Sequence, residues 1–141
     1  MTRINVVPVE ELADQHLIAE YREISRMPVF LKRSLASKKP LSIPEEYVFG
    51  KGHVSFFYDK LAYIKERHDA LKVEGFLRGF NLSSITMSLS DIHPRFCNNY
   101  DPTPAAISLN KERILSKLIM KPEWYKYRGE PISPTFIEKY K

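Results

Sequence analysis

The chain has 141 residues, of which 43% are hydrophobic and 28% charged, and its net charge is +5. This length and composition fit one domain with its own core and exclude wholesale disorder. No apolar run approaches the ~18 residues of a membrane helix, and Met1–Asn5 lacks the apolar stretch of a secretion signal, so we expect an intracellular protein with no membrane partner.

Two helices are predicted in the first half of the chain. Residues 10–26 contain no Gly or Pro, carry apolar residues at helical spacing, and end at Met27-Pro28. A short helical piece is expected around residues 29–36. The second long helix follows Gly50-Lys51-Gly52, a sequence typical of a turn, and ends at Gly79.

The second half contains one long helix and two irregular regions. Thr103-Pro104 is a good helix start, and the helix is expected to end before Pro122. Residues 81–102 have no clear periodicity and are interpreted as a long surface loop. We therefore predict an all-α fold: a single compact domain at 1–132 with about three long helices, short helical pieces and long loops, and a loosely held tail at 133–141.

Metal and cofactor chemistry is not indicated by the sequence. The single cysteine, Cys97, excludes an internal disulfide and a Cys-rich zinc site. The pairs His68-Asp69 and Asp91-Ile92-His93 lack the spacing of metal ligands. We expect neither a metal nor a cofactor.

Positive charge is concentrated near the C-terminal end of the third predicted helix. Residues 111–128 hold six Lys and Arg against two Glu, which accounts for the whole charge excess of the second half. Arg113, Lys117 and Lys121 follow one another at four-residue intervals and would line one ridge. Like charges at this spacing destabilise a helix, so the ridge indicates an anionic partner such as phosphate, although a solvated helix surface is the usual alternative.

Aromatic and cationic residues alternate directly after this ridge. Trp124-Tyr125-Lys126-Tyr127 combines flat rings that can stack on bases with a charge that can hold phosphate. The alternative is a core role for the rings, and we expect at least one of them to be buried.

Glu23 lies at the border between two stripes of the first predicted helix. The apolar stripe comprises Leu12, His16, Ala19 and Glu23, and the neighbouring stripe comprises Gln15, Arg22 and Arg26. A partly desolvated carboxylate beside cations is typical of an active site. A simple i,i+3 ion pair between Glu23 and Arg26 is the competing interpretation.

Several sequence blocks resemble the pyrimidine dimer DNA glycosylases of the phage T4 endonuclease V type. The matching blocks are Met1–Asn5, Glu11–Leu17, Ala19–Glu23, Gly52–Val54, Phe56–Lys60 and Trp124–Tyr127. The resemblance spans roughly residues 1–130. Arg128 and the extension at 133–141 depart from the family pattern, and residues 25–48 are divergent.

The resemblance implies a small all-α DNA repair enzyme without metal or cofactor. Such enzymes excise the 5′ base of an ultraviolet-induced cyclobutane pyrimidine dimer and then nick the strand by β-elimination, as a DNA glycosylase and AP lyase. The implied nucleophile is the free α-amine of Thr2, exposed by removal of Met1, which attacks C1′ to form a Schiff base. An unperturbed α-amine has a pKa of about 8, so part of it is neutral at pH 7. Glu23 matches the catalytic carboxylate.

The resemblance also implies a set of DNA contacts and a partner. The contacts around the lesion are Gln15, His16, Arg22 and Arg26, and Arg113 and Lys117 fit the phosphate ridge. Arg3 is a further DNA-binding residue. The partner is double-stranded DNA that contains pyrimidine dimers or abasic sites, bound by a monomer. Two alternatives stay open: a non-catalytic helical DNA-binding protein, and the same mechanism acting on a different base lesion.

Overall fold

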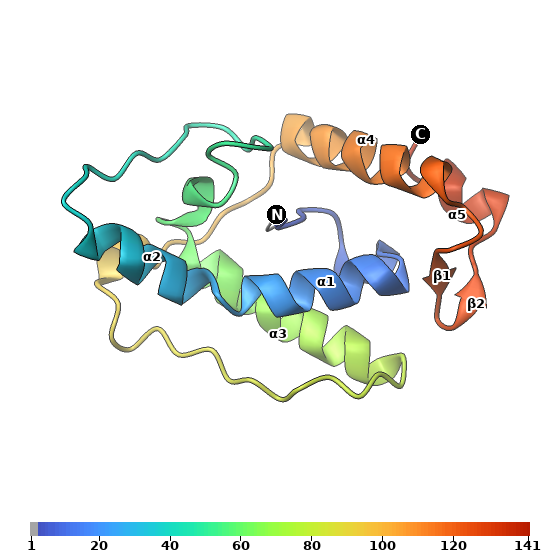
Figure 1. Cartoon of the computed structure of the whole chain (residues 1–141), viewed down its shortest axis with the longest axis horizontal. Coiled ribbons are helices and arrows are strands. Elements are labelled where there is room, and N and C mark those ends of the chain that lie inside the picture. Colours follow the sequence, from blue (N-terminus) through green and yellow to red (C-terminus); the bar gives the residue numbers. More distant parts are fainter. Residues whose placement is uncertain (1–2) are drawn as a thin grey trace.

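The computed structural model describes residues 3–141, and these form a mostly helical fold (Figure 1). The helices are α1 (Asp14–Ile24), α2 (Met27–Ala36), α3 (Leu61–Leu77), α4 (Pro104–Met120) and α5 (Pro134–Glu138). Short 3-10 turns occupy Val9–Glu11, Ser55–Phe57 and Pro94–Phe96, and two short strands, β1 (Lys126–Tyr127) and β2 (Glu130–Pro131), form an antiparallel pair. The predicted all-α class is confirmed.

The first predicted helix is divided into smaller elements. Residues Val9–Glu11 form a 3-10 turn, Leu12 is extended, and α1 begins only at Asp14. It ends at Ile24 because Pro28 has no N–H to donate to the carbonyl four residues earlier. The chain resumes as α2 at Met27, with Pro28 in its first turn, so the Met-Pro pair marks a helix start as well as a helix end.

The second predicted helix begins later than expected and ends as expected. The residues after Gly52 form a 3-10 turn, and the backbone of Lys60 then pairs with that of Cys97 before α3 begins at Leu61. At its end, Gly79 adopts φ +81°, and the N–H of Phe80 donates to the carbonyl oxygen of Gly75 at 3.0 Å. This is the Schellman arrangement that a glycine at this position favours.

The third helix agrees closely with the prediction. The Thr103 hydroxyl accepts a hydrogen bond from the N–H of Ala106 at 3.0 Å, and Pro104 occupies the first turn. Because α4 ends at Met120, Lys121 is the residue after the helix, with φ −146°. Arg113 and Lys117 therefore lie on α4, whereas Lys121 follows directly after its last residue.

The prediction of a loosely held tail is wrong. Ser133 caps α5 by accepting from the N–H of Phe136, and Phe136 and Tyr140 are buried. The Tyr140 hydroxyl also donates to the carbonyl oxygen of Glu11. The tail is held because the Phe136 ring packs against Tyr127 and Tyr140 bonds to the start of the chain.

The two-stranded ribbon has no counterpart in the sequence prediction. Arg128 and Gly129 connect the strands with φ +53° and +84°, which suits the right-handed twist of a two-residue hairpin. Asp14 accepts hydrogen bonds from the N–H groups of both turn residues, at 2.9 and 2.8 Å. The first turn of α1 thus holds the segment that follows α4.

The N-terminal segment from residue 3 lies between the α1–α3 pair and α4, as Figure 1 shows. Hydrogen bonds fix it on both sides. The Asn110 side-chain oxygen of α4 accepts from the N–H groups of Val6 and Val7, at 2.7 and 3.1 Å, and Asn5 donates to Glu20 of α1 at 2.8 Å. The start of the chain is therefore a structural element of the core.

Described as a whole, residues 3–141 include no helix that is both long and apolar enough to cross a membrane. Their His, Cys, Asp and Glu side chains form no group of three that could hold a metal ion.

Candidate active site

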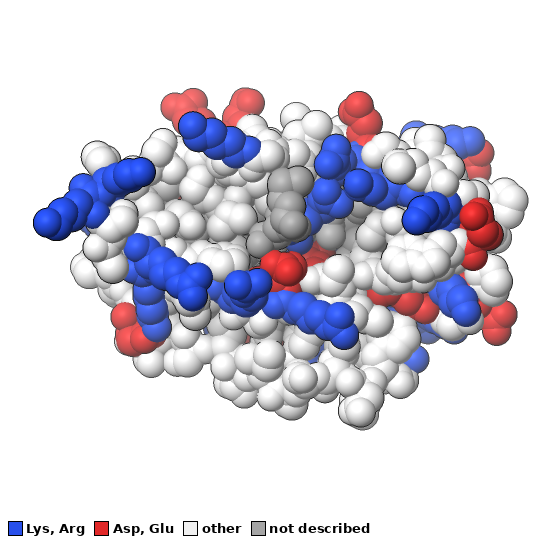
Figure 2. All heavy atoms as spheres, in the orientation of Figure 1, with Lys and Arg blue, Asp and Glu red and all other residues white. Residues whose placement is uncertain are grey.

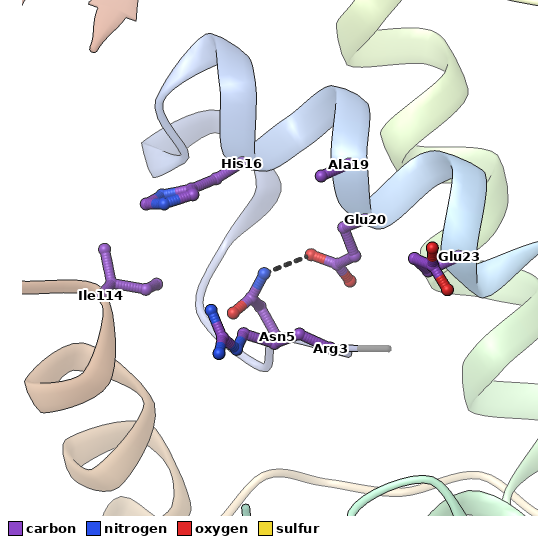
Figure 3. Close-up of a pocket in the computed structure, with 7 residues that line it drawn as sticks. All are labelled: Arg3, Asn5, His16, Ala19, Glu20, Glu23 and Ile114. Atoms are coloured by element: carbon purple, nitrogen blue, oxygen red, sulfur yellow. Dashed lines mark hydrogen bonds between the residues drawn. The ribbon is translucent and has the colours of Figure 1, made fainter. Parts of the chain in front are cut away.

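A small pocket of about 110 Å³ opens where the N-terminal segment passes between α1 and α4. Figure 3 shows its lining: Arg3 and Asn5 from the N-terminal segment, His16, Ala19, Glu20 and Glu23 from one side of α1, and Ile114 from α4. This volume holds several water molecules or one small group. Three predicted site residues, Arg3, His16 and Glu23, share this pocket.

The two carboxylates of the pocket have different environments. Glu20 is buried and accepts hydrogen bonds from Arg67 at 2.5 and 3.1 Å and from Asn5 at 2.8 Å. Glu23 retains 33% side-chain exposure and lies 3.9 Å from a guanidinium nitrogen of Arg26. Glu20 is therefore committed to the core, whereas Glu23 faces the pocket and solvent. The ion pair expected from the sequence coexists with this pocket position.

Cations surround the pocket. The guanidinium groups of Arg3 and Arg113 each lie 5.8 Å from the centre of the Phe49 ring. Burial, together with the neighbouring Arg113, lowers the pKa of Arg3 below its usual value. The Nε atoms of both arginines are buried without a hydrogen-bond partner among residues 3–141. Buried donors of this kind normally have a partner, and an anionic ligand would provide one.

His16 is neutral at physiological pH. Burial, and then the positive charges of Arg3 and Lys117, lower its pKa from 6.5 to about 4. Its ring packs against Tyr125, with centroids 4.8 Å apart, and its Nδ1 atom has no hydrogen-bond partner in the described part of the chain. A neutral imidazole here can donate or accept one hydrogen bond without adding charge to a cationic pocket.

Other predicted residues form the rim of the site. Gln15 donates to the carbonyl oxygen of Trp124 at 2.6 Å and accepts from the N–H of Lys126 at 3.0 Å, so its amide holds the aromatic segment against α1. Arg22 on α1 and Arg26, the residue before α2, are both exposed. Figure 2 shows Lys and Arg side chains in two rows, one over α1 and α2 and one over α4, with acidic side chains between them.

The aromatic segment divides into exposed and packed residues. Trp124 is 55% exposed, whereas Tyr125 is buried, as expected for at least one of the rings. Tyr127 lies away from the pocket. Its hydroxyl donates to the backbone carbonyl oxygen of Glu10 at 2.7 Å, and its ring contacts Phe136. Trp124 is thus the ring of this segment that is open to a base.

Thr2, the predicted nucleophile, lies outside the described residues. Sequence reasoning did not single out several residues that shape the site: Asn5, Glu20, Phe49, Arg67 and Asn110. Asn5 and Asn110 are bonded to each other at 2.8 Å although 105 positions separate them. Single buried amides at such a separation leave no periodic pattern.

The comparison with protein families agrees with this geometry. The model of the family described as pyrimidine dimer DNA glycosylase matches residues 1–87, which include the N-terminal segment, α1, α2 and α3. The matched stretch contains Arg3, His16 and Glu23, the three predicted residues of the pocket. The chain belongs to the pyrimidine dimer DNA glycosylase family.

Proposed function

We propose that this DNA repair enzyme is a bifunctional glycosylase and AP lyase that uses the α-amine of Thr2 as its nucleophile. The observation that supports the proposal is the pocket where the chain's N-terminal segment meets Glu23 among cations. Arg3 enters this pocket, and Thr2 is covalently bonded to Arg3. A nucleophile at the chain terminus therefore needs to reach only about one residue, ~3.8 Å, beyond a described pocket residue.

The proposed reaction begins at C1′ of the 5′ nucleotide of the dimer. The neutral amine forms a C1′–N bond while the glycosyl bond breaks, and the departing pyrimidine takes the bonding electrons and a proton. The pyrimidine stays attached to its 3′ neighbour through the cyclobutane ring. Loss of the amine proton and opening of the sugar at O4′ give the protonated Schiff base.

Strand cleavage follows from the Schiff base. Removal of a C2′ proton allows the C3′–O bond to break, and the 3′ phosphate leaves with the electron pair. Hydrolysis of the remaining imine then releases the enzyme. Glu23 is assigned the stabilisation of positive charge at C1′ and the proton transfers, because its carboxylate faces the pocket.

The cationic rows are assigned to DNA. Arg113, Lys117 and Lys121 would neutralise phosphates, and Arg22 and Arg26 would contact the DNA around the lesion. Trp124 would stack on a base, and His16 would contact the distorted nucleotide as a neutral group. We assign the activity to residues 1–132 of a monomer that acts on dimers and abasic sites in intracellular DNA.

Borohydride trapping on abasic DNA tests the nucleophile. Reduction of the imine should leave a stable protein–DNA adduct that maps to the N-terminal residue, and acetylation of that terminus should abolish it. Intact mass must first show that Met1 is removed, since a retained Met1 moves the amine by ~3.8 Å. An adduct that maps to a lysine side chain would overturn the assignment of Thr2.

Glu23→Gln tests the carboxylate. We expect dimer excision to fall by ~10² or more, the scale of a general acid–base contribution, while DNA affinity is retained. Glu66→Gln, an exposed glutamate on α3, serves as the matched control and should leave excision unchanged. Excision near the wild-type rate in Glu23→Gln would make Glu23 an ion-pair residue of a protein that uses another catalytic group.

A further inference from the structure

Ile4 is held by both of its backbone polar groups. Its N–H donates to Nε2 of His53 at 2.7 Å, and its carbonyl oxygen accepts from the Tyr47 hydroxyl at 2.8 Å. Both side chains are almost fully buried, with 2% of His53 and 5% of Tyr47 exposed. We name Tyr47 and His53 the Ile4 clamp.

The chemistry of the clamp is well defined. Nδ1 of His53 lies 2.7 Å from the carbonyl oxygen of Val48, so Nδ1 carries the proton and Nε2 has the lone pair that accepts from Ile4. Burial lowers the pKa of His53, which keeps the ring in this neutral form. The Phe49 ring stacks on His53 at 5.1 Å and fixes its plane. The imidazole is therefore oriented from three sides.

The turn Gly50-Lys51-Gly52 places His53 beneath the N-terminal segment. Gly50 and Gly52 adopt φ +74° and +93°, and a Cβ at Gly52 would lie 2.9 Å from a side-chain carbon of Pro44. The N–H of His53 then donates to the carbonyl oxygen of Gly50 at 3.1 Å. The glycines thus allow a tight turn that an alanine at Gly52 would not fit.

The position of Ile4 determines how far the chain terminus can travel. Ile4 precedes the pocket residue Asn5 and follows Arg3, whose guanidinium lies over Phe49. Two Cα–Cα steps, ~7.6 Å at most, separate Ile4 from Thr2. Fixing both backbone groups of Ile4 therefore limits how far a nucleophile two residues away can lie from this point.

From this geometry we infer that Tyr47 and His53 are positioning residues for the Schiff-base nucleophile. They contact the backbone of Ile4, and they act on the reaction by holding the terminal amine in line with C1′. The inference rests on the proposed function. A displacement of 1 Å can cost as much as ~10² in rate, so loss of one clamp hydrogen bond should slow imine formation about tenfold.

The test compares the rate of imine formation with DNA affinity. Tyr47→Phe keeps the ring and removes one hydrogen bond; His53→Leu removes the other, and His53→Gln restores an acceptor. We expect Tyr47→Phe and His53→Leu to trap abasic DNA about tenfold more slowly at saturating DNA, with Kd unchanged, and His53→Gln to recover part of the rate. Tyr58→Phe is the matched control, because the Tyr58 hydroxyl bonds Ser34 instead of the N-terminal segment.

The outcomes separate the two proposals. A wild-type protein that forms no adduct refutes the proposed function and this inference with it. Wild-type trapping together with unimpaired Tyr47→Phe refutes the inference alone, as does an equal loss in Tyr58→Phe, which would indicate a general effect on stability. If His53→Leu does not fold, Tyr47→Phe still decides the question.

Discussion

The neutral His16 in the pocket makes protein stability depend on pH. Its pKa falls from 6.5 to about 4 on folding, mainly through burial. Between these values the unfolded chain binds a proton that the folded protein does not, so the free energy of unfolding rises with pH in this window. The contribution is complete above pH 6.5 and is lost progressively as the pH falls towards 4.

The magnitude follows from the two pKa values. The pKa of His16 is 6.5 in the unfolded chain and about 4 in the folded protein. This difference lowers the free energy of unfolding at pH 5 by about 2 kcal/mol relative to pH 8, and the loss approaches ~3 kcal/mol below pH 4. His53 contributes in the same direction, because its pKa is also lowered. The wild-type protein should therefore lose more stability than His16 alone accounts for, and a His16 variant is needed to isolate its contribution.

Urea unfolding of wild type and His16→Gln at pH 8 and pH 5, at equal ionic strength, provides the measurement. The loss of stability between the two pH values should be about 2 kcal/mol smaller in His16→Gln. His93→Gln replaces an exposed histidine and should show the full wild-type loss. Equal losses in wild type and His16→Gln would refute the assignment of a partly buried, neutral imidazole at this position.

Three further results are expected. Lys117→Ala should flatten the plot of log affinity against log salt by about one unit on damaged and undamaged DNA alike, and an unchanged slope would mean that Lys117 lies on a solvated surface. Arg26→Ala should instead reduce the preference for damaged DNA. Phe136→Ala should cost about 3–5 kcal/mol in thermal or urea unfolding, and a loss below ~1 kcal/mol would show that α5 contributes little. Arg67→Met should cost about 3–5 kcal/mol in urea unfolding by leaving Glu20 as an uncompensated buried charge, and a loss below ~1 kcal/mol would contradict that cause.

Local sequence signals predicted the features that depend on a few neighbouring residues. Thr103-Pro104 and Gly79 correctly marked a helix start and a helix end, because capping is decided within one turn. The approach of Glu23 to Arg26 was also predictable, since only three positions separate the two residues.

Features that depend on distant contacts were missed. The attachment of the tail at 133–141 was not predicted because one of its partners lies at the start of the chain, as the bond from Tyr140 to Glu11 illustrates. The turn at Gly50–Gly52 was recognised, but its role in bringing His53 to Ile4 requires the folded arrangement. Sequence spacing cannot reveal an acceptor that lies 49 positions from its donor.

The bonds that hold the N-terminal segment also set the time at which the site is completed during synthesis. Val6 finds its partner in Asn110, 104 residues later, and Asp14 finds Gly129 after a further stretch of chain. At about 5–20 residues per second, the ribosome needs roughly 5–20 s to deliver Asn110 after Val6. During that interval the N–H groups of Val6 and Val7 lack the Asn110 oxygen that accepts from both of them, so the pocket cannot be enclosed on its α4 side until α4 has been synthesised.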